Sequence, residues 1–307
     1  MKDSIEAGSV PPPPPFAALP GITVRWLRVG TATAVARWRC EETRRELSEE
    51  RVQDWCAFDF ISSGSYLLRD RRGSTFVDAT RVAFFNPRSP YQTAHPAGFH
   101  DSGAIFAIRD DVVAEMLEAR QAGGTLDPTR LFEMQDAAIS SATYLRQRRL
   151  ADASAIPGPL DGLAFDEETL ALADRVMDEA YRPATGPAPS TPLARSRWRD
   201  VVEATKMHLA SDIRGAHRLE ALAKACGLSP YHLCRVFRIA TGNTIHRHLT
   251  QLRLRAALDR LNDARHDLVS LALDVGFSSH SHFTLAFRRE FGVPPSRALR
   301  DHRRLLR

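Results

Sequence analysis

The sequence predicts a multi-domain α+β protein, in which a β-rich N-terminal sandwich or barrel with following helices precedes an all-α C-terminal module. Short alternating apolar and polar runs fill residues 21–108, a pattern that half-buried strands produce. Four prolines interrupt residues 183–192, and proline cannot continue a helix interior. Beyond that break, one helical pattern occurs twice at an offset of 49 residues.

Length and composition set the broad class. The chain has 307 residues and is 43% hydrophobic, enough for two compact domains with separate cores. It contains no apolar run approaching the roughly 20 residues that span a bilayer, and no apolar stretch after Met1 that resembles a signal peptide. The four cysteines are too few and too scattered for a disulfide framework. We therefore expect a reduced, cytoplasmic protein.

The net charge of +5 is divided unevenly. Residues 195–307 hold 21 basic and 10 acidic side chains, a balance of +11, whereas the first 194 residues have a balance of −6. Such a division is typical of a domain that binds a polyanion, although a solubilising surface explains the charge equally well. Nearly all the basic side chains are arginines, which suit bidentate contact with phosphate or guanine.

The N-terminal part begins with a tail. Residues 1–20 contain five consecutive prolines, which predict an extended, disordered segment. Strands follow, with turn residues between them. They are predicted at residues 33–40, 57–62, 65–69, 74–77, 81–85, 91–95 and 104–108. So many short strands indicate a small sandwich or barrel.

Three helices are predicted after the strands, at residues 112–119, 131–150 and 165–180. Two of them would either cover a face of the β-domain or form a dimer contact, and the spacing supports both roles. Residues 183–194 form a proline-rich linker. The expected domains are therefore a β-rich domain with helices at 21–182 and a helical domain at 195–307.

The helical domain contains an internal repeat. Residues 221–229 (ALAKACGLS) align with residues 270–278 (SLALDVGFS). In each copy a short helix ends at a glycine, Gly227 or Gly276, and a serine then caps a second helix. The caps are Ser229 in the first copy and Ser278 or Ser279 in the second. This is a helix-turn-helix pattern, whose second helix enters the major groove of DNA.

Apolar stripes define the buried side of the helices in this domain. In the second helix of each copy the stripe consists of Leu233, Val236, Phe237 and Ala240, and of Phe283, Ala286 and Phe287. A long helix at 244–262 carries Ile245, Leu249, Leu252 and Ala256 on one side. It would hold the two copies at a fixed separation.

Residues 222–238, 252–258 and 275–296 resemble the AraC/XylS family of bacterial transcription regulators. The most specific run is VGFSSHSHFTLAFRREFGVPPS at 275–296, and the resemblance covers nearly all of residues 199–300. It implies a sequence-specific transcription regulator that reads successive major-groove segments of double-stranded DNA with two recognition helices.

The resemblance also implies which side chains contact DNA. Base contacts fall on Tyr231, Cys234, Arg235, His280, Ser281, His282 and Thr284, and phosphate contacts on Arg238, Arg288 and Arg289. Arg235 can make a bidentate contact with guanine. Leu285 stands where the family commonly has arginine, and leucine cannot hydrogen-bond to a base. We therefore expect the first copy to supply more of the base-specific energy.

The N-terminal domain resembles the cupin-like sensor domains of the same family, notably at residues 84–96 (FFNPRSPYQTAHP). This resemblance implies a small-molecule effector, of unknown identity, that changes how the C-terminal domain is presented to DNA. RNA polymerase and a second copy of the chain are further candidate partners. A dimer would read two half-sites.

No metal, cofactor or catalytic residue is predicted. Cys40, His95, His100 and Asp101 could converge on a metal, but the β-domain lacks the H-x-H pair of cupin enzymes, so structural or pocket-lining roles are favoured. His280 and His282 have that spacing, yet they lie in a recognition helix and DNA contact is the favoured role.

The remaining cysteines and the aromatic residues have simpler interpretations. Cys40 is expected to be a buried apolar residue rather than a thiol sensor paired with Cys56, and Cys226 is expected in the core. Strand alternation allows only one of Phe84 and Phe85 inside. Most of the aromatic side chains should form core, and some should line a pocket; they are Trp38, Phe58, Phe60, Phe84 and Phe85.

Two rival functions remain. A cupin-type metal-dependent enzyme with a DNA-binding tail would contain iron or manganese. A non-specific nucleic-acid binder would distinguish target from random DNA only weakly. The sequence contains no G-x-S-x-G, P-loop or G-x-G-x-x-G motif that would indicate catalysis.

Overall fold

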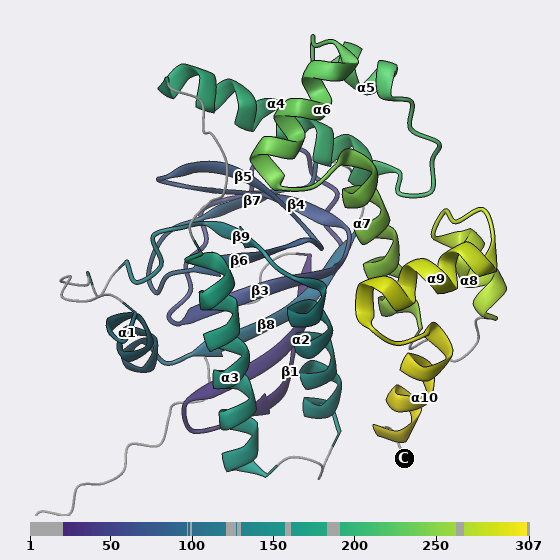
Figure 1. The fold of residues 1–307 in the computed structure, drawn as a ribbon. Helices are drawn as coiled ribbons and strands as arrows, with labels where there is room; N and C mark the ends of the chain where they lie inside the picture. The colour runs from purple at the N-terminus through teal and green to yellow at the C-terminus, as the bar shows by residue number, and fades with distance from the viewer. Residues whose placement is uncertain are drawn as a thin grey trace, which may run out of the picture.

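The computed structural model describes residues 21–96, 98, 100–120, 127, 130–156, 161–182, 191–261 and 267–305. The predicted tail at 1–20 and most of the predicted linker, residues 183–190, lie outside the described residues. Within these limits the chain forms two antiparallel sheets followed by helices, and then a helical C-terminal part (Figure 1). The predicted α+β class is confirmed.

The larger sheet has six strands in the order β1-β2-β8-β3-β6-β9. Their bounds are Ile22–Val29, Thr33–Cys40, Asp101–Ile108, Cys56–Ser63, Arg81–Phe85 and Asp136–Ala138, respectively. The smaller sheet has the order β5-β4-β7, with bounds Gly73–Asp78, Ser65–Asp70 and Gln92–Ala94. Seven of the nine strands in the described residues match the predicted alternating segments to within three residues, whereas β1 and β9 match none of them.

Helices cover the outer face of the six-stranded sheet. Helices α2 (Ser141–Ser154) and α3 (Gly162–Ala180) lie across it in Figure 1 and contact β2. Val35, on the face of β2 opposite Trp38, is consequently as buried as its neighbours. Of the two predicted roles for these helices, covering the sheet is the one observed. Helix α1 (Asp110–Glu118) follows β8 directly.

One predicted helix was wrong in its first half. Residues 131–140 are not helical, and α2 begins only at Ser141, capped by Ser140. The side chain of Asn86 binds the backbone of Phe132 on both sides, donating to its carbonyl (2.9 Å) and accepting from its amide (2.8 Å). Residues 136–138 then join β6 as the edge strand β9. Tertiary hydrogen bonds therefore override the helical spacing in this segment.

The C-terminal part consists of seven helices within the described residues. They are α4 (Pro192–Ser211), α5 (Leu219–Ala225), α6 (Pro230–Thr241), α7 (Ile245–Arg260), α8 (Leu268–Asp274), α9 (His280–Phe291) and α10 (Pro295–Leu305). Ser229 and Ser279 cap α6 and α9 by accepting from backbone amides. Gly242 ends α6 with a positive φ of 72°, which side chains with a Cβ rarely adopt.

Candidate nucleic-acid interface

Helix α6 presents one buried and one exposed side. Leu233, Val236 and Phe237 are buried against α4 and α5. Ala240, predicted in the same stripe, is exposed because α6 ends one residue later. The exposed side carries the predicted contact residues Tyr231, Cys234, Arg235 and Arg238. Tyr231 is 77% exposed, so its ring is free to reach a ligand surface.

Helix α9 repeats this plan with differences. Phe283 and Phe287 are buried, and Ser281, His282, Arg288 and Arg289 are exposed. Leu285 is 64% exposed, and an isolated apolar side chain on this surface suits contact with a thymine methyl group.

Two predicted base contacts on α9 are less accessible than the others. His280 and Thr284 are only half exposed, and His280 Nε2 lies 3.4 Å from Thr284 Oγ1 on the next turn of the same helix. Of the predicted contacts on α9, Ser281, His282, Arg288 and Arg289 are therefore the most available.

Helix α7 connects the two copies. In Figure 1, α6 lies beside its upper end and α9 beside its lower end. The predicted single apolar side was too narrow, because α7 is buried on several sides, against α4, α6, α8, α9 and strand β3. Its buried residues include His248, Gln251 and Arg255. Both recognition helices therefore pack on α7, which itself packs on the N-terminal domain.

Buried polar contacts bind α7 to that domain. His248 Nε2 lies 3.1 Å from Asp78 Oδ2 at the end of β5. Arg255 is completely buried, donates to the carbonyls of Ala79 and Ile139, and lies 4.6 Å from the centre of the Tyr144 ring. The sequence pattern did not reveal these contacts. The available signal was spacing, because His248 and Arg255 lie four and three residues from Leu252 of the predicted apolar side.

The charges around Asp78 determine its ionisation. Burial alone would raise the pKa of Asp78, but His248, Lys206 and the hydroxyl of Thr80 together hold that pKa well below its ordinary value. Burial lowers the pKa of Lys206 to about 8, and the nearby charge of Arg81 acts in the same direction. The contact between the two parts of the chain is therefore a compact electrostatic cluster.

A second feature, a small cavity, lies in the β-domain. Its volume is about 60 Å³, enough for a few waters or one small group. Apolar and aromatic side chains form most of its wall, and several buried polar side chains face it. The lining residues are Ile22, Val24, Trp38, Cys40, Arg51, Gln53, Asp59, Tyr66, Phe85, Tyr91, Thr93, His95, Asp101 and Ile105.

The aromatic residues divide between core and cavity as alternation requires. Phe84 is buried in the core, whereas Phe85 is half-buried and lines the cavity. Trp38 also lines it, and Gly103 of β8 allows the indole to approach, since a Cβ there would lie 2.8 Å from the Trp38 ring.

Asp59 is the buried carboxyl group of the cavity wall. Trp38 Nε1 and the Tyr66 hydroxyl each donate to it at 2.6 Å. Burial raises the pKa of Asp59 to about 7, although these two hydrogen bonds act to lower it. Asp59 can therefore change its charge close to neutral pH.

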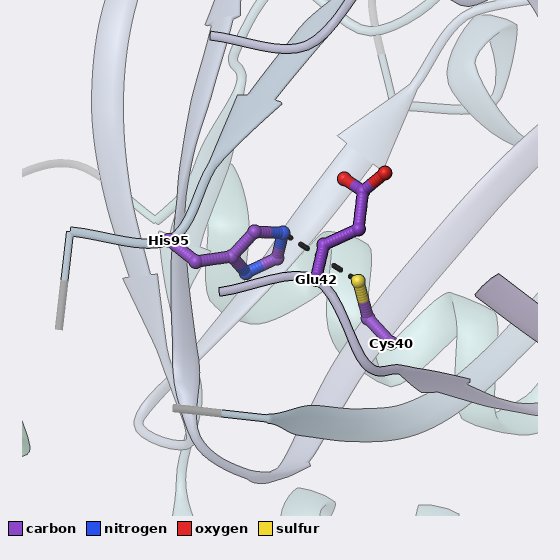
Figure 2. A group of neighbouring side chains, drawn as sticks. All are labelled: Cys40, Glu42 and His95. Carbon is purple, nitrogen blue, oxygen red and sulfur yellow. Dashed lines mark hydrogen bonds between the residues drawn. The ribbon is translucent and has the colours of Figure 1, made fainter. Parts of the chain in front are cut away.

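Three potential metal ligands meet beside the cavity. Cys40 Sγ lies 3.5 Å from His95 Nε2, and the ligand atoms of Cys40, Glu42 and His95 all lie within 4.8 Å of one another (Figure 2). Of the four residues that the sequence analysis weighed as metal ligands and disfavoured, Cys40, His95 and Asp101 are together, whereas His100 is exposed. Glu42 was missed, although its position two residues after Cys40 was a usable signal.

The other two thiols considered in the sequence lie elsewhere. Cys56 is buried, and its amide donates to Asp110 Oδ1 at 3.1 Å. Cys226 is half-buried and lies 3.7 Å from the Thr205 hydroxyl, so it packs at the margin of the core.

Comparisons with known proteins match the helical part. A helix-turn-helix domain family matches residues 222–301. Regulatory protein SoxS of Salmonella typhimurium is 35% identical over 78 residues, which cover 25% of this chain and 73% of SoxS. The chain belongs to the AraC/XylS family. It is therefore a DNA-binding transcription regulator, and the predicted resemblance is confirmed.

Two further matches cover larger parts of this chain. The bifunctional transcriptional activator/DNA repair enzyme AdaA of Bacillus subtilis is 27% identical over 125 residues, covering 40% of this chain and 58% of AdaA. The crystal structure of ToxT from Vibrio cholerae O395 matches over 92% of this chain and 98% of ToxT, with 11% identity and a TM-score of 0.34. The matched relatives do not support the rival cupin-type enzyme.

No helix in the described part of the chain combines the length and the apolar composition that crossing a bilayer requires.

Proposed function

We propose that this AraC/XylS regulator reads its operator with the exposed faces of α6 and α9 and responds to a small effector in the β-domain cavity. Base contacts come from Tyr231, Cys234 and Arg235 on α6 and from Ser281 and His282 on α9. His280 and Thr284, which are half exposed, make secondary contacts. Arg238, Arg288 and Arg289 contact phosphates.

The observation that carries the effector response is the anchoring of α7 in the N-terminal domain. Tyr66 lines the cavity and directly follows Ser65 in β4. Because β4 pairs with β5, Ser65 lies opposite Asp78. Asp78 in turn contacts His248 of α7. A ligand that moves Tyr66 therefore changes the support of the helix that positions both recognition helices. Differential binding to two such arrangements is what allosteric coupling requires.

A second connection runs through α2. The Tyr144 hydroxyl donates to the carbonyl of Ile61, in the strand that also carries Asp59. The Arg255 guanidinium of α7 stacks on the Tyr144 ring. Cavity and α7 are thus linked by contiguous packed groups. In this proposal the protein acts in the cytoplasm, a dimer reads two half-sites, and RNA polymerase is the partner at the promoter.

The first experiment measures binding of the full chain to fragments from its own chromosomal neighbourhood and to random DNA at one near-physiological salt concentration. Tight and selective binding to one fragment supports the proposal and locates the operator. Equal, weak and steeply salt-dependent binding to all fragments contradicts it, because that is the behaviour of a non-specific basic surface.

The effector response is tested on the operator found in this way. Candidate small molecules are screened by their effect on operator affinity of the wild-type chain. A response that is present in wild type but reduced in Arg255→Leu supports coupling through α7. An undiminished response in that variant, with folding verified by circular dichroism, contradicts this route.

A further inference from the structure

We propose that Cys40, Glu42 and His95 form a binding site for one zinc-class divalent cation at the wall of the β-domain cavity. The site goes beyond the function proposed above, since it assigns a metal to a domain for which only an unidentified effector was inferred. Metal binding is also measurable without DNA, so its failure would leave operator recognition untouched.

The separation of Cys40 and His95 fits a tetrahedral zinc ion. Zinc binds thiolate sulfur at about 2.3 Å and imidazole nitrogen at about 2.0–2.1 Å. At a tetrahedral angle these bond lengths place the two ligand atoms roughly 3.5 Å apart. Cys40 Sγ and His95 Nε2 are separated by 3.5 Å, and Figure 2 shows them pointing toward each other. The Glu42 carboxylate lies within 4.8 Å of both.

The fold holds these ligands rigidly. Cys40 is the last residue of β2 and pairs with Asp101 of β8. His95 directly follows β7, and its backbone amide donates to the carbonyl of Arg44 at 2.9 Å, which fixes it beside the segment that carries Glu42. Cys40 and His95 are nearly inaccessible to solvent. Strand pairing holds Cys40 in the sheet, and a backbone hydrogen bond holds His95 against the segment that follows β2.

Asp101 supplies the outer partner that a metal-binding histidine needs. Its Oδ1 lies 3.3 Å from His95 Nδ1, on the opposite side of the imidazole from Cys40. Both carboxylate oxygens of Asp101 are buried, and neither has a hydrogen-bond partner among the described residues. A carboxylate behind the histidine orients the ring and strengthens the ligand. A cation on Nε2 would draw the Nδ1–H toward Asp101 and give this buried carboxyl group a hydrogen bond.

The ligands supply negative charge to a dication. Binding displaces the protons of the Cys40 thiol and of His95 Nε2 to solvent, so a thiolate, a neutral imidazole and a carboxylate face the metal. Arg51 and Arg44 contact the Glu42 oxygens at 3.3 and 3.5 Å. These are long contacts that orient the carboxylate, and each oxygen retains a lone pair for the metal.

The ligand set selects the class of metal. Thiolate and imidazole favour zinc and similar transition metals over magnesium and calcium, which prefer oxygen. Three protein ligands leave one coordination position, as in zinc sites that accept an external ligand. Because Cys40 and His95 also line the cavity, that position is available to a water or to a donor atom of an effector.

The test uses the full-length chain, freed of metal under reducing conditions and titrated with Co²⁺. A thiolate–cobalt charge-transfer absorption that saturates at one equivalent, and is abolished by one equivalent of Zn²⁺, is the expected result. Cys40→Ser should lose the band. Asp101→Asn should keep it but lower the affinity about 10–100-fold. The matched controls are Cys234→Ser and His100→Ala, both at exposed positions. They should bind Co²⁺ as the wild type does.

Several outcomes overturn the proposal. They are a wild-type chain without a thiolate band, a Cys40→Ser variant that retains it, and a band lost in Cys234→Ser instead. The wild-type titration decides the question even if Cys40→Ser misfolds, and thermal melting of the metal-free variants identifies such misfolding.

Discussion

Asp78 and His248, 170 positions apart in the sequence, form a buried pair with 3.1 Å between Oδ2 and Nε2. The pair joins the end of β5 to the helix that links the two helix-turn-helix copies. Both side chains are almost completely buried. The position of the recognition helices relative to the β-domain therefore depends on a contact between two ionisable groups.

Breaking this pair should destabilise the whole chain. His248→Leu leaves the Asp78 carboxylate buried without its main partner, and the free energy of unfolding should fall by about 3–5 kcal/mol. The double variant with Asp78→Asn should recover part of that loss, since the unpaired buried carboxylate is then absent. Urea denaturation measures both values. A His248→Leu variant as stable as wild type would show that the pair does not form.

The same pair gives a dependence on acid. Because the pKa of Asp78 in the folded chain lies below its ordinary value of 3.8, its contribution is complete above that value and is lost as the pH falls further. Asp78→Asn should therefore flatten the acid limb of the stability curve. An unchanged acid limb would contradict the assigned direction.

Arg235→Ala should lower selectivity for the operator over random DNA by about 1–3 kcal/mol, because a bidentate base contact is removed. Arg39→Ala removes the same charge from an exposed position on β2 and serves as the matched control. Fluorescence anisotropy on operator and random duplexes measures the difference. Equal losses on both duplexes would instead assign Arg235 to a phosphate.

Leu285→Ala should cost less selectivity than Arg235→Ala, by about 1 kcal/mol or more, since leucine offers only apolar contact. Both substitutions are tested on the same duplexes and at the same salt concentration. A larger loss at Leu285 would mean that the second copy dominates base reading.

Asp59→Asn should change how stability depends on pH. Burial raises the pKa of Asp59 to about 7, so the folded chain holds a proton that the unfolded chain has released between about pH 4 and 7. The free energy of unfolding of the wild type should consequently fall as the pH rises through this window, whereas Asp59→Asn should not show this fall. We expect the variant to gain about 1–3 kcal/mol relative to wild type between about pH 5 and 8.

Lys206 should make stability rise with pH in the alkaline range, the opposite of the effect of Asp59. Its pKa is about 8 in the folded chain and 10.5 ordinarily, so the unfolded chain binds more protons between these values and stability rises with pH. Relative to Lys206→Met, wild type should gain about 1–3 kcal/mol between about pH 7 and 10. Urea titrations at both pH values, with Lys224→Met as an exposed control, test this. A constant difference would show that Lys206 is solvated.

The recognition helices were predictable because their signals are local. Gly227 and Ser229 define a helix end and a helix start by backbone conformation and capping alone. The buried stripe of α6 follows from a spacing of three and four residues, and the exposed positions follow by subtraction. Ala240 was wrongly predicted to be buried, because the apolar stripe extends beyond the last buried turn of the helix.

Most strands of the β-domain were predictable, but their pairing was not. Alternation located β3 and β6, yet their order in the sheet depends on contacts far apart in the chain. The segment at 131–140 was misassigned because Asn86 captures its backbone, a competition that helical spacing cannot reveal. Glu42 was not associated with His95 because the two residues are 53 positions apart in the sequence and only the fold brings them together.

The sequence alone determined the class of the chain, the double helix-turn-helix and the surface that each recognition helix exposes, since these follow from periodicity, capping and composition. Only the tertiary structure decided that α7 is anchored by His248 and Arg255, and that Cys40, Glu42 and His95 meet beside a cavity. The reason is physical: local geometry is encoded within a few residues, whereas buried polar contacts depend on which distant groups the packing brings within hydrogen-bond reach.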